Sequence, residues 1–160
     1  YSTIVPGVIR GGERSSVVPE ICELKVSRFT VPGESGKTFY DEVQQIINIL
    51  KQQDPTFNAK VKITYESNPS LISEKEVIVQ HLIRACRKVY STKNVKVSGS
   101  SGHADADFLV NMAGIPTVIY GPGNPRVAHA PDEYIKISDV VTASKVYALT
   151  LYYALGDEKL

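Results

Sequence analysis

The sequence has no tryptophan, two cysteines and one methionine among its 160 residues. Two cysteines are too few for the disulfide framework of a small secreted domain, so Cys22 and Cys86 are expected to be reduced thiols, as in a cytoplasmic protein. A single disulfide between them is the alternative. No apolar run reaches the roughly 20 residues that span a membrane. Because 18 Lys and Arg stand against 17 Asp and Glu, the charge balance argues against a nucleic acid or an anionic membrane as partner.

The only methionine is Met112, and Tyr1 opens directly into a strand-like pattern. We therefore expect a fragment, a processed product or an expressed piece of a longer protein. No stretch has the form of a signal peptide. Apolar residues make up 42% of the chain, which is enough for one compact domain or two small ones.

The first 66 residues predict an α+β layer. Alternating apolar residues predict strands, and an apolar stripe at helical spacing predicts one helix. The predicted strands cover residues 2–10, 17–29 and 57–65, and the helix covers 37–51. Pro6 and Gly7 should break the first strand.

The second part, residues 70–160, predicts an α/β layer that follows a boundary at Asn68-Pro-Ser. Its first helix should begin at a capping box formed by Ser73 and Glu76. Helices are predicted over residues 73–89, 105–112 and 138–156, with short strands at 95–97 and 116–120.

His129 lies in a loop, residues 121–134, that contains three prolines and two glycines. Such a loop is stiff and sharply turned, which suits a side chain held for chemistry. Histidine is the commonest metal ligand and a frequent base. The alternative is a histidine at the surface or at the edge of the core.

Residues 32–38, PGESGKT, look like a phosphate-binding loop between a strand and a helix. The motif requires glycine where Val31 stands, and the preceding strand is half polar. A tight turn that leads into a helix is the competing interpretation.

His103, Asp105 and Asp107 could form a metal site on a strand, where alternate residues share a face. The apolar residues that follow favour a helix beginning here, on which residues two apart diverge. Asp105 then becomes a helix-start carboxylate or one that supports a nearby site, and Gly102 and His103 are expected to face a ligand.

A series of motifs runs through most of the chain in a fixed order. It consists of Gly11-Gly12, VVPEIC at 17–22, PGE at 32–34, SGSSGHADA at 98–106, GIPTVIYGPG at 114–123 and AHAPDEY at 128–134. This series resembles the zinc-dependent family of aminoacylases, acetylornithine deacetylases, succinyl-diaminopimelate desuccinylases and glutamate carboxypeptidases.

The resemblance implies a fold and a set of roles. Residues 1–66 would be the later part of a ferredoxin-like lid that mediates homodimerisation, and residues 70–160 the C-terminal part of an α/β catalytic domain. The complete enzyme would hold two zinc ions, with cobalt or manganese as possible substitutes. The implied roles are metal ligand for His129, substrate contact for Gly102 and His103, and supporting carboxylates for Asp105 and Glu133.

The family's remaining metal ligands and its general base match no residue of this chain, so no catalytic residue is assigned and the chain alone should be inactive. Phe29 and Asp107 stand where the family often has arginine. A small dicarboxylate substrate is therefore disfavoured relative to a less charged N-acyl amino acid or a small peptide. The alternatives are a non-catalytic lid and dimerisation fragment and a ligand-binding α+β module of another family.

Overall fold

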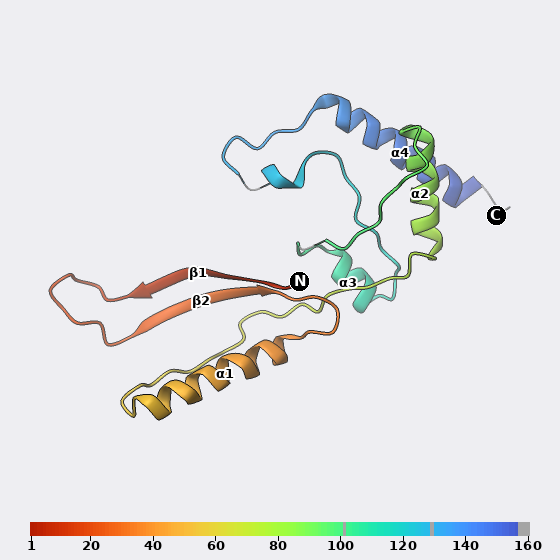
Figure 1. The fold of residues 1–160 in the computed structure, drawn as a ribbon. Coiled ribbons are helices and arrows are strands. Elements are labelled where there is room, and N and C mark those ends of the chain that lie inside the picture. The colour runs from red at the N-terminus through yellow and green to blue at the C-terminus, as the bar shows by residue number, and fades with distance from the viewer. Residues whose placement is uncertain (101, 129, 157–160) are drawn as a thin grey trace. The chain divides into compact units, whose positions relative to one another are not determined.

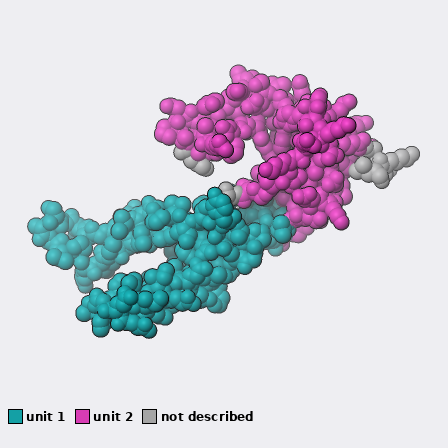
Figure 2. Space-filling model, viewed as in Figure 1, with its two compact units in different colours: residues 1–71, 101–111 teal, residues 72–100, 112–160 magenta. Residues whose placement is uncertain are grey.

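The computed structural model describes residues 1–100, 102–128 and 130–156, and it has a mixed α/β architecture (Figure 1). The chain divides into two compact units (Figure 2). The first contains Tyr1–Leu71 and Ser101–Asn111, and the second contains Ile72–Ser100 and Met112–Leu160. The first break follows Leu71, next to the expected boundary segment Asn68-Pro-Ser, and residues 101–111 belong to the first unit.

An antiparallel hairpin opens the first unit. Strand β1, Thr3–Gly11, pairs with β2, Cys22–Phe29, from Thr3 opposite Phe29 to Gly11 opposite Cys22. The pairing is irregular between Pro6 and Val8, where proline has no N–H to donate to a partner strand.

The predicted second strand is wrong at its start, because β2 begins at Cys22 rather than at residue 17. Gly12 has a φ of +75°, a left-handed conformation that suits the turn after β1. Pro19 packs against Gly12 so closely that a Cβ added to Gly12 would lie 3.0 Å from the proline ring. Pro19 also has no N–H to donate to a neighbouring strand. The chain between the strands is therefore a loop.

Helix α1, Gly36–Gln53, begins one residue before its predicted start. The side chain of Ser35 accepts a hydrogen bond from the Thr38 backbone N–H at 3.3 Å and caps the helix. The Gly36 N–H donates to the Glu66 carboxylate at 2.8 Å. The position that a phosphate would take in a phosphate-binding loop is thus filled by a carboxylate of the chain itself.

An extended segment, residues 57–70, runs back along α1 (Figure 1). Its expected alternation is present at the start, where Phe57, Ala59 and Val61 are half-buried and Lys60 and Lys62 are exposed. It nevertheless forms no ladder, so the predicted strand over 57–65 is wrong within the described part of the chain. A strand requires a neighbour to accept its backbone hydrogen bonds, and no other described segment pairs with it.

Two helices pack together in the second unit (Figure 1). They are α2, Val77–Val89, and α4, Ile137–Gly156. Their buried contact is formed by Ala85, Cys86, Val146 and Tyr153. Partly buried apolar residues, Leu82, Val89, Val95, Tyr120 and Leu149, surround it.

The capping box predicted at Ser73 is wrong. The Ser73 hydroxyl accepts from the backbone N–H of Lys75 at 3.1 Å, and α2 begins four residues later, at Val77. The predicted strands at 95–97 and 116–120 are also not assigned as strands. Val95 and Tyr120 still pack onto the helix core, as residues of buried strands would, but these segments have no ladder partner among the described residues.

Two short helices complete the described fold: α3, Ala106–Asn111, close to the prediction of 105–112, and the 3-10 turn η1, Pro125–Val127. Both cysteines are free thiols, as expected; Cys22 is exposed and Cys86 is buried. Among the described residues, no helix is both long and apolar enough to cross a lipid bilayer.

Candidate functional site

His103 lies at the centre of a polar cluster in the first unit. Its Nδ1 is 3.1 Å from Oδ2 of Asp107, and its Nε2 is 3.2 Å from the hydroxyl of Tyr65. Asp107 also accepts, through Oδ1, from the Ser70 hydroxyl at 2.7 Å and from the Ser70 backbone N–H at 3.2 Å. We call these four residues the His103 cluster. Two chain segments more than thirty residues apart thus meet at one imidazole.

Aromatic packing fixes the plane of the imidazole. Tyr65 lies edge-on to the ring of His103, with centroids 6.0 Å apart, and Phe108 lies edge-on at 5.8 Å. The side-chain amide of Asn111 donates to the backbone carbonyl of Asn68 at 2.8 Å, which ties the end of α3 to the same extended segment. The ring is therefore held by side chains rather than presented on a loose loop.

The remaining predicted site residues lie outside the His103 cluster. Gly102 and Asp105 are exposed, and Asp105 stands immediately before α3, where its backbone carbonyl accepts from the N–H groups of Phe108 and Leu109. Glu133 is exposed in the loop after η1. His129, the predicted metal ligand, lies outside the described residues, so its geometry is not on view.

The described residues do not assemble a metal site. Residues 1–100, 102–128 and 130–156 contain no group of three or more His, Cys, Asp or Glu side chains placed to hold an ion. A catalytic zinc usually takes three protein ligands. The described residues alone therefore do not complete a zinc site.

The loop on both sides of residue 129 nevertheless has a defined local structure. The Asn124 side chain accepts from the Arg126 N–H at 3.0 Å and caps η1, whose first residue is Pro125. Gly123 has a φ of +99°, which glycine adopts without strain. Asp132 also has a positive φ, +60°. The expectation of a sharply turned loop is met on both sides of residue 129.

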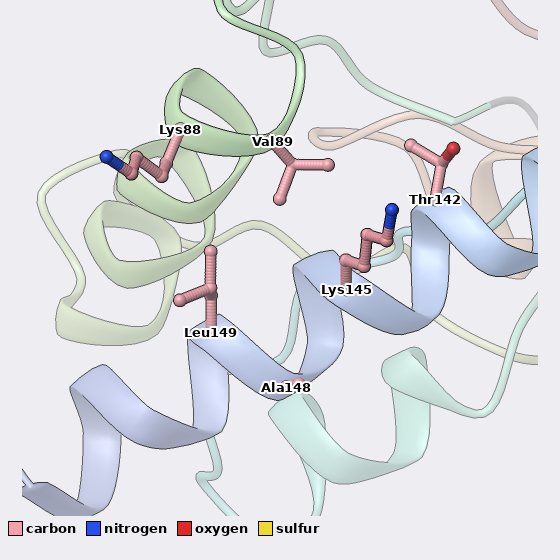
Figure 3. Close-up of a pocket in the computed structure, with 6 residues that line it drawn as sticks. All are labelled: Lys88, Val89, Thr142, Lys145, Ala148 and Leu149. Carbon is pink, nitrogen blue, oxygen red and sulfur yellow. The ribbon is translucent and has the colours of Figure 1, made fainter.

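A groove of about 450 Å³ lies on the second unit between α2 and α4 (Figure 3). It is lined by Lys88, Val89, Thr142, Lys145, Ala148 and Leu149. The two ammonium groups point apart rather than toward one ligand (Figure 3). The groove contains no acid or base suited to hydrolysis and none of the predicted site residues.

A tyrosine cluster in the second unit is also unsuited to acid–base chemistry. The hydroxyls of Tyr90 and Tyr120 are 3.0 Å apart, and the Tyr147 hydroxyl donates to the backbone carbonyl of Tyr120 at 2.7 Å. Burial, followed by the hydrogen bond to Tyr90, raises the pKa of Tyr120 well above its usual value. This phenol stays protonated and serves packing.

Comparison with known proteins assigns the family. The profile of peptidase family M20/M25/M40 matches residues 3–153. The chain belongs to this family. The resemblance inferred from the motif series is thereby confirmed.

The M20 chain is similar to several named proteins. An acetylornithine deacetylase from Myxococcus xanthus is 26% identical over 156 residues, which cover 98% of this chain and 39% of that protein. An N-formyl-4-amino-5-aminomethyl-2-methylpyrimidine deformylase from Halalkalibacterium halodurans is 25% identical over 162 residues, covering 94% and 38%. The crystal structure of an M20 family metallo-carboxypeptidase from Sulfolobus solfataricus superposes with a TM-score of 0.71 at 25% identity, covering 97% and 36%. The chain thus spans about two fifths of the length of these relatives, and its fold class is confirmed.

Sequence reasoning missed Tyr65 and Ser70 as members of the His103 cluster. It compared His103 with residues two positions apart and overlooked the four-residue spacing to Asp107, which brings side chains together at the start of a helix. Tyr65 lies 38 positions from His103 and gives no local signal of this contact.

Proposed function

We propose that this M20 chain is the C-terminal portion of a metal-dependent hydrolase that cleaves an amide bond of an N-acyl amino acid or a small peptide. The match over residues 3–153 carries the proposal. Relatives named as a deacetylase, a deformylase and a carboxypeptidase all act on amide-type bonds by their names, which supports the reaction class.

The motif series supports the following roles for the two parts of the chain and for individual residues. Residues 1–66 belong to the lid and residues 70–160 to the catalytic domain. His129 is a zinc ligand, Glu133 and Asp105 are carboxylates that support the metal site, and Gly102 and His103 contact the substrate. Two zinc ions, or cobalt or manganese in their place, bind in the complete protein. No described residue is assigned the role of general base, so hydrolysis requires the part of the protein that this chain does not include.

The ion pairs that Arg28 forms within the chain support a less charged substrate. Its guanidinium donates to Glu34 at 2.9 Å and also to Glu42, and its side chain is 9% exposed. The cation is thus neutralised within the lid segment. It is not available to receive a substrate carboxylate.

The hairpin supports the proposed homodimer. The two strands carry apolar side chains that are at least half exposed: Ile4 at 53%, Ile9 at 72% and Leu24 at 58%. Apolar side chains that a hairpin leaves exposed in this way suit burial in a contact with a second chain. The free thiols and the proposed cytoplasmic location are mutually consistent, because thiols stay reduced there.

The test uses the complete protein with His129→Ala. We expect loss of bound zinc, measured by atomic emission, together with loss of hydrolysis of an N-acetyl amino acid. Lys96→Ala, an exposed change in the second unit, is the control and should retain both. Unchanged zinc content and rate in His129→Ala would refute the ligand role.

The second candidate is a non-catalytic lid and dimerisation fragment. The absence of a three-ligand metal group among the described residues favours it for the chain alone. Light scattering and a zinc titration of this chain separate the candidates, because a tight zinc site in the chain alone would contradict the view that ligands are missing.

A further inference from the structure

The hydrogen-bond partners of His103 determine which nitrogen carries the proton in the neutral ring. A carboxylate only accepts hydrogen bonds, so at the 3.1 Å contact the Nδ1 atom of His103 must donate to Oδ2 of Asp107. Asp107 is itself fixed from the other side, because its Oδ1 accepts both N–H and O–H from Ser70. The proton of the neutral ring is thereby placed on Nδ1.

The exposed edge of the ring therefore carries a lone pair on Nε2. The Tyr65 hydroxyl, 3.2 Å away, donates to this lone pair. While it does so, the remaining lone pairs of the hydroxyl oxygen can only accept. The His103 side chain is 39% exposed, so a ligand can reach this edge. Because the single lone pair of Nε2 already accepts the Tyr65 hydroxyl, the free acceptor that such a ligand would meet is the Tyr65 oxygen.

We propose that Asp107 is a positioning residue that holds His103 as a hydrogen-bond acceptor, so that the His103 cluster selects substrates that present a donor over those that present a carboxylate. This inference rests on the proposed function. Suitable donors are an amide N–H, a hydroxyl or an ammonium group. A carboxylate would instead meet the lone pairs of the Tyr65 oxygen, with the negative charge of Asp107 behind the imidazole, and both contacts are repulsive.

A purely structural role for Asp107 makes a different prediction. If the carboxylate served only to tie α3 to Ser70, its replacement would alter stability without changing the tautomer of His103 or the preference among substrates. A readout of the imidazole itself therefore distinguishes the two roles.

The first test is nitrogen-15 NMR of the histidine rings in this chain. The chain has three histidines, so the signals of His103 are assigned by their loss in His103→Gln. We expect the Nδ1–H tautomer in the unmodified chain. In Asp107→Asn the side-chain amide can donate to Nδ1 instead, and we expect the Nε2–H form to gain population.

The control for the NMR test is Asp139→Asn, which makes the same acid-to-amide change on α4 in the other unit. It should leave the ring signals of His103 unchanged. An Nε2–H tautomer in the unmodified chain, or identical signals in Asp107→Asn and the unmodified chain, would overturn the positioning role.

The second test uses the complete protein and two substrates of nearly equal size, N-acetylglutamine and N-acetylglutamate. We expect kcat/KM to favour the amide by on the order of 10-fold, because the amide can donate to the Tyr65 oxygen whereas a carboxylate can only accept. Asp107→Arg should reverse the preference. Equal kcat/KM values, or a preference that survives Asp107→Arg, would overturn the selectivity.

The two tests also separate this inference from the function on which it rests. If the complete protein binds metal but hydrolyses neither substrate nor any other N-acyl amino acid, the proposed function and the selectivity fail together. The NMR result would still decide whether Asp107 positions the ring of His103.

Discussion

The backbone N–H of Gly36 donates to the carboxylate of Glu66 across thirty positions of sequence, at 2.8 Å. A Cβ at Gly36 would lie 2.5 Å from that carboxylate oxygen, which is closer than real contacts allow. We therefore expect Gly36→Ala to destabilise the first unit by about 1 kcal/mol, because the exposed Glu66 side chain must move aside and its hydrogen bond at the helix start is lost. Urea unfolding measures the change.

Gly7→Ala is the matched control for that measurement. An added Cβ at Gly7 meets nothing within 4 Å. Its effect should stay within about 0.5 kcal/mol, as for other surface substitutions. Equal losses in the two variants would show that the Glu66 contact does not stabilise the unit.

The ion pair of Glu34 and Arg28 predicts a dependence of stability on pH. The hydrogen bond from Arg28 lowers the pKa of the Glu34 carboxyl below its usual value. A group whose pKa is lowered by folding stabilises the folded state above its unfolded pKa and loses that contribution as pH falls through the folded pKa. We expect Glu34→Gln to be less stable than the unmodified chain at pH 7 and the difference to shrink as the pH falls below about 4.5.

Thermal unfolding from pH 7 down to pH 3 measures this difference. Glu20→Gln, a change in the exposed loop between β1 and β2, should follow the unmodified chain across the range. A stability difference for Glu34→Gln that stays constant with pH would contradict the ion-pair assignment.

The two thiols should differ in reactivity. Burial raises the pKa of Cys86, whereas Cys22 is exposed. Because the thiolate is the reactive form, iodoacetamide should label Cys22 quickly and Cys86 slowly until the chain is unfolded. Mass spectrometry follows both sites, and Cys22→Ser should remove the fast phase. Equal labelling rates in the folded chain would argue against the packing of α2 on α4.

Replacing the buried His81 should not reduce the stability of the second unit. Its side chain is 4% exposed, and its Nδ1 has no hydrogen-bond partner within the described ranges. A buried unpaired polar group costs about 1–3 kcal/mol, so His81→Leu should leave the second unit as stable as before or more stable. Val146→Ala, at a fully buried apolar position, should instead lose about 2 kcal/mol. Similar losses in both variants would reveal a partner for Nδ1.

The elements that could be predicted from the sequence are those fixed by nearby residues. The periodic apolar stripe of α1 and the cap at Ser35 lie within one helix, and both hairpin strands lie close in sequence. The strands predicted at 57–65, 95–97 and 116–120 alternate or are apolar as strands should be, but a ladder also needs a neighbour, which sequence periodicity does not reveal. The capping box failed because the Ser73 hydroxyl had a nearer donor, the Lys75 N–H.

The same distinction between nearby and distant residues applies to the candidate site. Gly102, His103 and Asp105 were selected from one continuous motif, whereas the contact of His103 with Tyr65 depends on how distant segments fold. The sequence alone shows that Asp107 stands where the family often has arginine. The hydrogen bond between Asp107 and the imidazole of His103, in contrast, is seen only in the structure.

Large apolar side chains remain uncovered on both units, among them Met112 at 80%, Ile137 at 82% and Leu155 at 84% exposed. Produced by itself, this polypeptide should therefore bind a hydrophobic dye through these exposed side chains. Co-production with the other part of the proposed complete protein should remove the dye binding, because the exposed isoleucine and leucine side chains would then be covered.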